Sequence, residues 1–95
     1  MSDDPQKSAA ARLPPPSFSL LVATFASQAM VAFGKAPDPI DGKREVRLEL
    51  ARHAIDMLDI LEQKTKGNLS ADENAMLEGI LHQLRLEFLE ATTPK

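Results

Sequence analysis

A long run without any charged residue, from Ser17 to Phe33, restricts most strongly how this chain can fold. Its large apolar side chains are Phe18, Leu20, Leu21, Val22, Phe25, Met30, Val31 and Phe33. The prolines at 14–16 block an earlier helix start, Ser17 suits an N-cap, and Gly34 suits the left-handed residue that closes a helix. Together these signals predict a helix over 17–33.

The apolar residues of this predicted helix do not keep to one side. A helix that is apolar all round lies in the centre of a core or in a membrane. From Phe18 to Phe33 the helix would span ~24 Å, which is shorter than the ~30 Å hydrocarbon layer of a bilayer. We therefore expect a core helix, and contact with a membrane surface is the alternative.

The next part of the chain predicts a compact loop and a second helix. Pro37, Pro39 and the Asp41-Gly42 turn signal indicate a loop of fixed shape, or alternatively a recognition loop that offers Pro37-Asp38-Pro39 to a partner. Apolar residues at helical spacing then predict a helix over 43–66. These residues are Val46, Leu50, Ala51, Ala54, Ile55, Met57, Leu58 and Leu61.

A third helix is predicted over 70–91. Ser70 and Glu73 have the spacing of a capping box at its start. The main apolar stripe is Leu77, Ile80, Leu81, Leu84 and Phe88. The short turn at Asn68-Leu69 requires the second and third helices to form an antiparallel hairpin, packed on the first. The predicted fold is therefore all-α, with a disordered tail over 1–12, one helical domain over 13–91 and a C-terminal tail over 92–95.

The third helix has a second, weaker face, made of Ala75, Gly79, His82, Leu86 and Leu89. Glycine in a helix interior costs up to ~1 kcal/mol relative to alanine, so Gly79 suggests the close approach of another backbone. That backbone would be either the first helix or a second copy of the protein.

Three helices around one core need one apolar stripe each, and this chain offers more. The surplus predicts a homo-oligomer, most simply a two-fold homodimer with the first helices near the axis. The candidate interface residues are Phe18, Val22, Ala23, Phe25, Ala26, Ala29, Met30, Ala75, Gly79, His82 and Leu86. A charge introduced at Ala23 or Ala26 is expected to split the dimer.

Few residues could carry chemistry. His53 and His82 each follow a carboxylate by four residues, Glu49 and Glu78 respectively, a spacing that suits a metal ligand pair or an acid–base pair. No third ligand follows from the spacing, and no phosphate loop or nucleophile motif is present, so we expect no metal, no cofactor and no enzyme activity. His53 borders the apolar face of its helix and is expected to be partly buried and hydrogen-bonded.

The composition excludes some classes and fits others. The chain has no cysteine, which excludes thiolate chemistry and is compatible with a cytoplasmic location. Its net charge is −3 and it has no basic stripe with interleaved aromatic residues, so nucleic-acid binding is not expected.

Several segments together resemble one known family. They are Leu13-Pro-Pro-Pro-Ser-Phe-Ser19, Pro37-Asp-Pro39, Leu50-Ala-Arg-His-Ala-Ile-Asp-Met-Leu58, Lys64-Thr-Lys-Gly-Asn-Leu69 and the capping box. Over roughly Leu13 to Leu89 the chain is similar to the small bacterial family of domain of unknown function eighteen-forty-four. The resemblance implies a helical fold and brings no catalytic or ligand residue with it.

The function predicted from the sequence is a non-catalytic cytoplasmic interaction module. It would act through its own oligomer or by docking a helix of a protein partner. The alternative is a peripheral membrane protein whose first helix lies against lipid.

Overall fold

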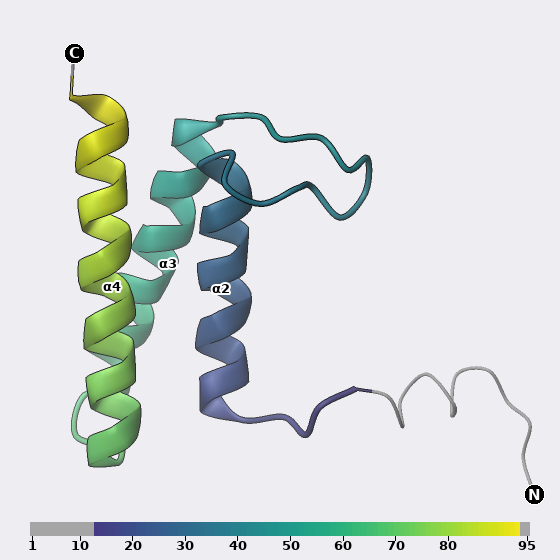
Figure 1. Ribbon diagram of the computed structural model, residues 1–95. Helices are drawn as coiled ribbons and strands as arrows, with labels where there is room; N and C mark the ends of the chain where they lie inside the picture. Colours follow the sequence, from purple (N-terminus) through teal and green to yellow (C-terminus); the bar gives the residue numbers. More distant parts are fainter. Residues whose placement is uncertain (1–12, 94–95) are drawn as a thin grey trace, which may run out of the picture.

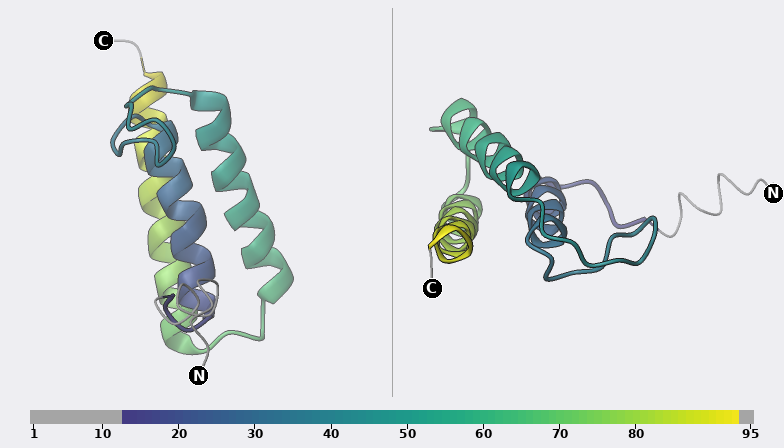
Figure 2. Two further views of the ribbon diagram at one scale, coloured as in Figure 1. Left: turned by 90° about the vertical axis from the view of Figure 1, so that its right-hand side faces the viewer. Right: turned by 90° about the horizontal axis from the view of Figure 1, so that it is seen from above.

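The computed structural model describes residues 13–93 and contains three helices. They are α2 (Phe18–Ala32), α3 (Leu48–Thr65) and α4 (Ala71–Thr92) (Figure 1). All three pairs of helices are in contact, and α3 and α4 form an antiparallel hairpin beside α2 (Figure 2). The predicted all-α fold is confirmed.

The predicted tails fall largely beyond this part of the chain. The N-terminal tail over 1–12 lies outside the described residues, and so do residues 94–95. The last helix continues to Thr92 and so enters the predicted C-terminal tail, while Thr93 caps it.

Both ends of α2 use the predicted caps. The Ser17 hydroxyl accepts a hydrogen bond from the Leu20 N–H at 3.0 Å. At the other end the Gly34 N–H donates to the Val31 carbonyl at 2.9 Å, and the Gly34 φ of 76° turns the chain back so that the next amide can also reach the helix. The Lys35 N–H reaches the Met30 carbonyl at 3.0 Å, which completes a Schellman motif. Sequence signals within a few residues therefore fix both ends of this helix.

The predicted start of the second helix is wrong. The backbone of Val46 pairs with Phe33 in an isolated antiparallel bridge, and the Arg47 N–H donates to the Ala32 carbonyl at 2.7 Å. These contacts draw residues 43–47 into an extended limb that returns along the end of α2, so α3 begins only at Leu48. Val46 is 61% exposed and does not belong to the apolar face of the helix.

The capping box at the start of α4 is confirmed. The Ser70 hydroxyl accepts from the Glu73 N–H at 3.1 Å, and the Glu73 carboxylate accepts from the Ser70 N–H at 2.9 Å. These two bonds satisfy amide donors that a free helix end would leave unpaired.

The core lies between the three helices and consists of aliphatic side chains and one phenylalanine. Its buried residues are Val22, Ala29, Ala32, Phe33, Ala51, Ala54, Ile55, Leu58, Leu77, Leu81 and Leu84. Leu58, Leu77 and Leu81 have no exposed surface. The rings of Phe33 and Phe88 meet edge to face, with centroids 6.5 Å apart, and join the end of α2 to α4.

The first helix is a core helix, as expected, but it is not buried on all sides. Only one side of α2 is buried, while Leu20 and Leu21 on its other sides are 36% and 44% exposed. The reason is that only α3 and α4 pack against α2 within the described residues, and two neighbours cover one face of a helix.

Candidate functional site

A groove of about 530 Å³ lies where α2, the loop over 33–47 and the start of α3 meet. Apolar side chains form its floor, and they are Val31, Ala32, Leu50 and Ala54. Short polar side chains and one histidine line its walls: Thr24, Ser27, Gln28 and His53. The loop supplies the rim, with Asp38, Pro39, Asp41, Lys43, Glu45 and Arg47. The groove is therefore apolar at its base and charged at its edge.

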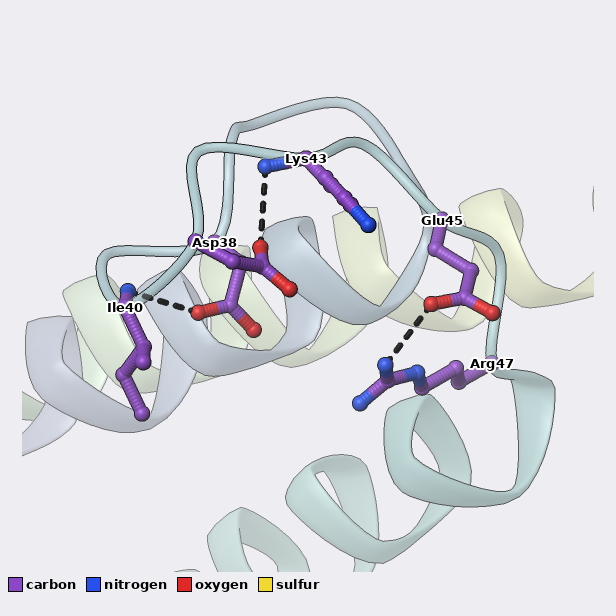
Figure 3. Close-up of polar contacts among 6 residues, drawn as sticks. Asp38, Ile40, Lys43, Glu45 and Arg47 are labelled. Carbon is purple, nitrogen blue, oxygen red and sulfur yellow. Dashed lines mark hydrogen bonds and ion pairs between the residues drawn. The ribbon is translucent and has the colours of Figure 1, made fainter.

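The loop that forms the rim is held by its own hydrogen bonds (Figure 3). A carboxylate oxygen of Asp38 accepts from the Ile40 N–H at 2.7 Å, and one of Asp41 accepts from the Lys43 N–H at 2.9 Å. Two backbone bonds of 2.8 Å close the loop, from the Asp38 N–H to the Lys43 carbonyl and from the Gly42 N–H to the Asp38 carbonyl. The loop therefore has the fixed shape that its prolines and turn residues predict.

One ion pair attaches this loop to α4, and two further polar contacts lie within the loop itself. Lys35 pairs with Glu87 of α4 at 2.5 Å, and this hydrogen-bonded carboxylate raises the pKa of the Lys35 ammonium group. Arg44 donates to the Lys35 carbonyl at 3.0 Å. The 2.7 Å bond from Arg47 to Glu45 likewise raises the pKa of the Arg47 guanidinium group. Both cations therefore stay charged at neutral pH.

Ile40 lies at the tip of the loop and is 94% exposed, more than any other large apolar residue of the described chain. The Asx turn at Asp38 fixes its backbone. An apolar side chain in this position contributes nothing to the core of its own chain. Core packing therefore does not explain why an isoleucine occupies the tip of the loop.

The side of α2 that faces away from the core contains no charged residue. We call Leu20, Ala23, Thr24, Ser27, Gln28 and Val31 the α2 outer face. The spacing of these residues puts them on one side of the helix, and four of them also line the groove. The Thr24 hydroxyl donates to the Leu20 carbonyl at 2.8 Å, so it is satisfied within the helix. The outer face is uncharged and continues into the apolar part of the groove, and the charged residues of this surface lie along the rim of the groove.

The predicted interface residues of α2 divide into three groups. Val22 and Ala29 are 0% exposed and belong to the core, so they leave the set of candidate interface residues. Phe18, Phe25, Ala26 and Met30 are partly buried and pack against the core. Ala23 alone of this set is exposed. The sequence prediction treated every side of the helix as available, whereas one side faces α3 and α4. A charge at Ala26 would therefore test folding, and Ala23 is the better position for testing association.

The structure brings the predicted α4 residues together on one exposed face, made of Ala75, Gly79, His82 and Leu86. A Cβ atom added at Gly79 would meet no atom within 4 Å. Within the described residues, therefore, the first helix does not pack against Gly79, which was one of the two predicted explanations. The other, a second copy of the protein, stays a prediction.

Both histidines are exposed, and the expectation that His53 is partly buried is wrong. Ala54 and Ile55, next to His53, face the core, which turns the imidazole outward onto the wall of the groove. Within residues 13–93 no ion pair joins either histidine to the carboxylate four residues earlier, and no three potential metal ligands cluster.

Sequence reasoning missed the groove and Ile40. The groove is built from three elements that come together through contacts between distant residues, among them the bridge between Phe33 and Val46. A local signal for Ile40 exists, because an isoleucine between Asp38-Pro39 and Asp41-Gly42 occurs where turn residues normally dominate.

No helix among the described residues combines the length and hydropathy needed to cross a bilayer.

Comparison with known proteins identifies the chain by its family. A search of curated proteins and a search of solved structures each found no match. A family model described as Domain of unknown function (DUF1844) matches residues 15–90. The matched segment contains α2, the loop, α3 and nearly all of α4. The chain therefore belongs to the family described as Domain of unknown function (DUF1844).

Proposed function

We propose that this protein is a non-catalytic interaction module that pairs with a second copy of itself through the α2 outer face and the adjoining groove. The observation that carries this proposal is the exposed, uncharged outer face of α2. The groove with its apolar floor extends this surface to the start of α3.

The absence of charge distinguishes this surface from the other helices. The exposed sides of α3 and α4 carry charged residues such as Arg52, Asp56 and Glu78. In a two-fold interface each surface meets an identical one, so like charges near the axis would face each other. The α2 outer face has no such repulsion, and the charged residues of the proposed interface are confined to the rim of the groove. Covering Leu20, Leu21 and Leu50 would also remove apolar area from water, which contributes about 25 cal/mol per Å².

The polar groups of the groove support binding rather than catalysis. The Thr24 hydroxyl is used within its helix, and His53 has no carboxylate partner among the described ion pairs. A nucleophile needs a base within hydrogen-bond reach, and the hydrogen bonds described for the groove's hydroxyl and carboxylate groups are all local to their own helix or loop. We also propose a cytoplasmic location, which the lack of cysteine supports.

Contact with a membrane surface has weaker support. Interfacial helices combine an apolar face with lysine and arginine that attract anionic lipids, whereas the α2 outer face has no basic residue. In a flotation experiment with anionic vesicles we expect the protein to stay in the soluble fraction. Flotation with the vesicles would contradict the proposed self-association and would favour membrane binding.

A charge at Ser27 tests the proposed surface. Ser27 is exposed, lies on the α2 outer face and lines the groove, so Ser27→Lys should weaken the dimer at least ~10-fold because two ammonium groups would approach each other. The matched control is Gln83→Lys on the exposed side of α4. Light scattering after size exclusion measures association, and circular dichroism checks that both variants fold. Dissociation by the Gln83 variant alone would move the interface to α4.

A further inference from the structure

We infer that the occupant of the groove is the loop tip of a second copy, so that Ile40 of each chain enters the groove of the other. This inference rests on the proposed self-association and specifies how the two copies fit together.

The first reason is that the single chain already holds Ile40 exposed and in a fixed position. Its side chain is 94% exposed, and the Asx turn and the backbone bonds of the loop fix its position. A side chain on an ordered loop loses little conformational freedom when it is bound, so more of its burial free energy appears as affinity. Nothing described in its own chain covers this residue.

The second reason is that the groove offers an apolar floor near its charged rim. Leu50 is 52% exposed there, next to Val31 and the buried Ala54. A compact apolar anchor with charged neighbours matches this surface, and Ile40 lies between the carboxylates of Asp38 and Asp41.

The third reason is that the loop carries opposite charges on its two parts. Its tip, over 38–41, has two carboxylates and no cation. Its returning limb, over 43–47, has three basic residues and one acidic residue, a net charge of +2. Glu45 already pairs with Arg47, while Lys43 forms no ion pair among the described residues. When two copies exchange tips, Asp38 or Asp41 of one chain can pair with Lys43 at the rim of the other groove, which also holds its own Asp38, Asp41 and Glu45.

The shape of the molecule allows this exchange. The loop leaves the end of α2 and extends sideways from the helices, so that α2 and the loop together form a hook (Figure 1). The groove is lined by both arms and is therefore the concave side of the hook. Two hooks related by a two-fold axis can clasp, with each tip in the concave side of the other.

The extent of the surface also favours an exchange. The 15-residue α2 is ~22 Å long, and a helix is ~10 Å across, so one helix face is small beside the roughly 800 Å² per partner of a typical stable interface. The loop tip and the groove add a second contact region to each copy.

Engineered cysteines test the exchange between chains, because the natural chain has none. One chain carries Ile40→Cys and the other, with a size tag, carries Leu50→Cys. Both positions are exposed, so neither change removes core packing. After mixing and treatment with a short bis-maleimide, we expect a covalent heterodimer that links position 40 of one chain to position 50 of the other. Exposed Ala75→Cys on α4 is the control, and we expect no links from it.

A second measurement uses matched isoleucines. Ile40→Ser removes two anchors from each dimer and should weaken dimerisation about 100-fold or more. Ile60→Ser changes a 52% exposed isoleucine that does not line the groove and should leave dimerisation unchanged.

The outcomes separate this inference from the function on which it rests. A dimer that is unaffected by Ile40→Ser, or that links through position 75 and not between 40 and 50, would overturn the exchange and leave self-association standing. A chain that stays monomeric at every concentration would overturn both.

Discussion

Replacing Gly34 by alanine tests the contact that fixes the base of the loop. Gly34 has a φ of 76°, and a Cβ atom there would lie 3.1 Å from Cγ2 of Val46. Gly42 has a similar φ of 70°, but a Cβ atom there would meet nothing within 4 Å. The two glycines therefore share the conformational requirement and differ in the steric one, so Gly42→Ala is a matched control.

The expected losses in the free energy of unfolding follow from the conformational requirement and the steric requirement. A non-glycine residue in the left-handed region costs about 1–2 kcal/mol, which applies to both variants. In Gly34→Ala the Val46 side chain must also shift by a few tenths of an ångström, and a distortion of its χ1 angle adds about 0.5–1.5 kcal/mol. Because Val46 is 61% exposed, it has room to turn away and the additional loss stays limited. We expect a loss of about 1–2 kcal/mol for Gly42→Ala and about 2–3 kcal/mol for Gly34→Ala.

Urea unfolding followed by circular dichroism measures this difference, at one protein concentration for all variants because dimerisation shifts apparent stability. In a Val46→Ala background the Cγ2 atom is absent, so the loss at Gly34 should fall to the value at Gly42. Equal losses for the two glycine variants in the natural background, or an unchanged loss at Gly34 after Val46→Ala, would refute the steric explanation.

Three further predictions concern the core, a cap and an ion pair. Leu58→Ala removes a side chain with no exposed surface and should cost about 2–5 kcal/mol in urea unfolding, whereas Ile60→Ala, at a 52% exposed position outside the groove, should cost under about 1 kcal/mol. Similar losses would contradict the described core. Ser70→Ala removes one half of the capping box and should cost about 1 kcal/mol, measured in the same way, and no loss would mean that the box does not stabilise α4. The Lys35 pKa is raised above its ordinary 10.5 by the hydrogen bond to Glu87, so the contribution of the pair is present below pH 10.5 and is lost as the pH rises through the folded-state pKa. Lys35→Met should therefore flatten the alkaline limb of the stability profile, and an unchanged limb would refute the role of this pair.

The ends of the helices were predictable where short-range chemistry determines them. Ser17 and Gly34 bound α2, and Ser70 with Glu73 starts α4, because each cap depends on residues within a few positions. The start of α3 was not predictable in this way. Val46 continues the helical spacing of apolar residues, but its bridge to Phe33 and the bond from Arg47 to Ala32 depend on the distant end of α2.

The candidate site was less accessible from the sequence than the fold. An uncharged run shows that a helix has apolar surface to bury, yet it does not show how many other helices of the chain pack against it. Leu20 and Leu50 are exposed because only two other helices pack on α2 and α3 in the described chain. The groove joins residues from three elements, so it exists only in the folded protein.

The mass of the natural protein in solution tests the central claim most directly. Light scattering after size exclusion, without detergent and over a range of concentrations at neutral pH, distinguishes one chain from two. We predict twice the mass of the chain at high concentration, with a fall toward the single-chain mass on dilution. The mass of one chain at every concentration would contradict the claim, because the uncharged outer face of α2 and its groove would then face water without a second copy.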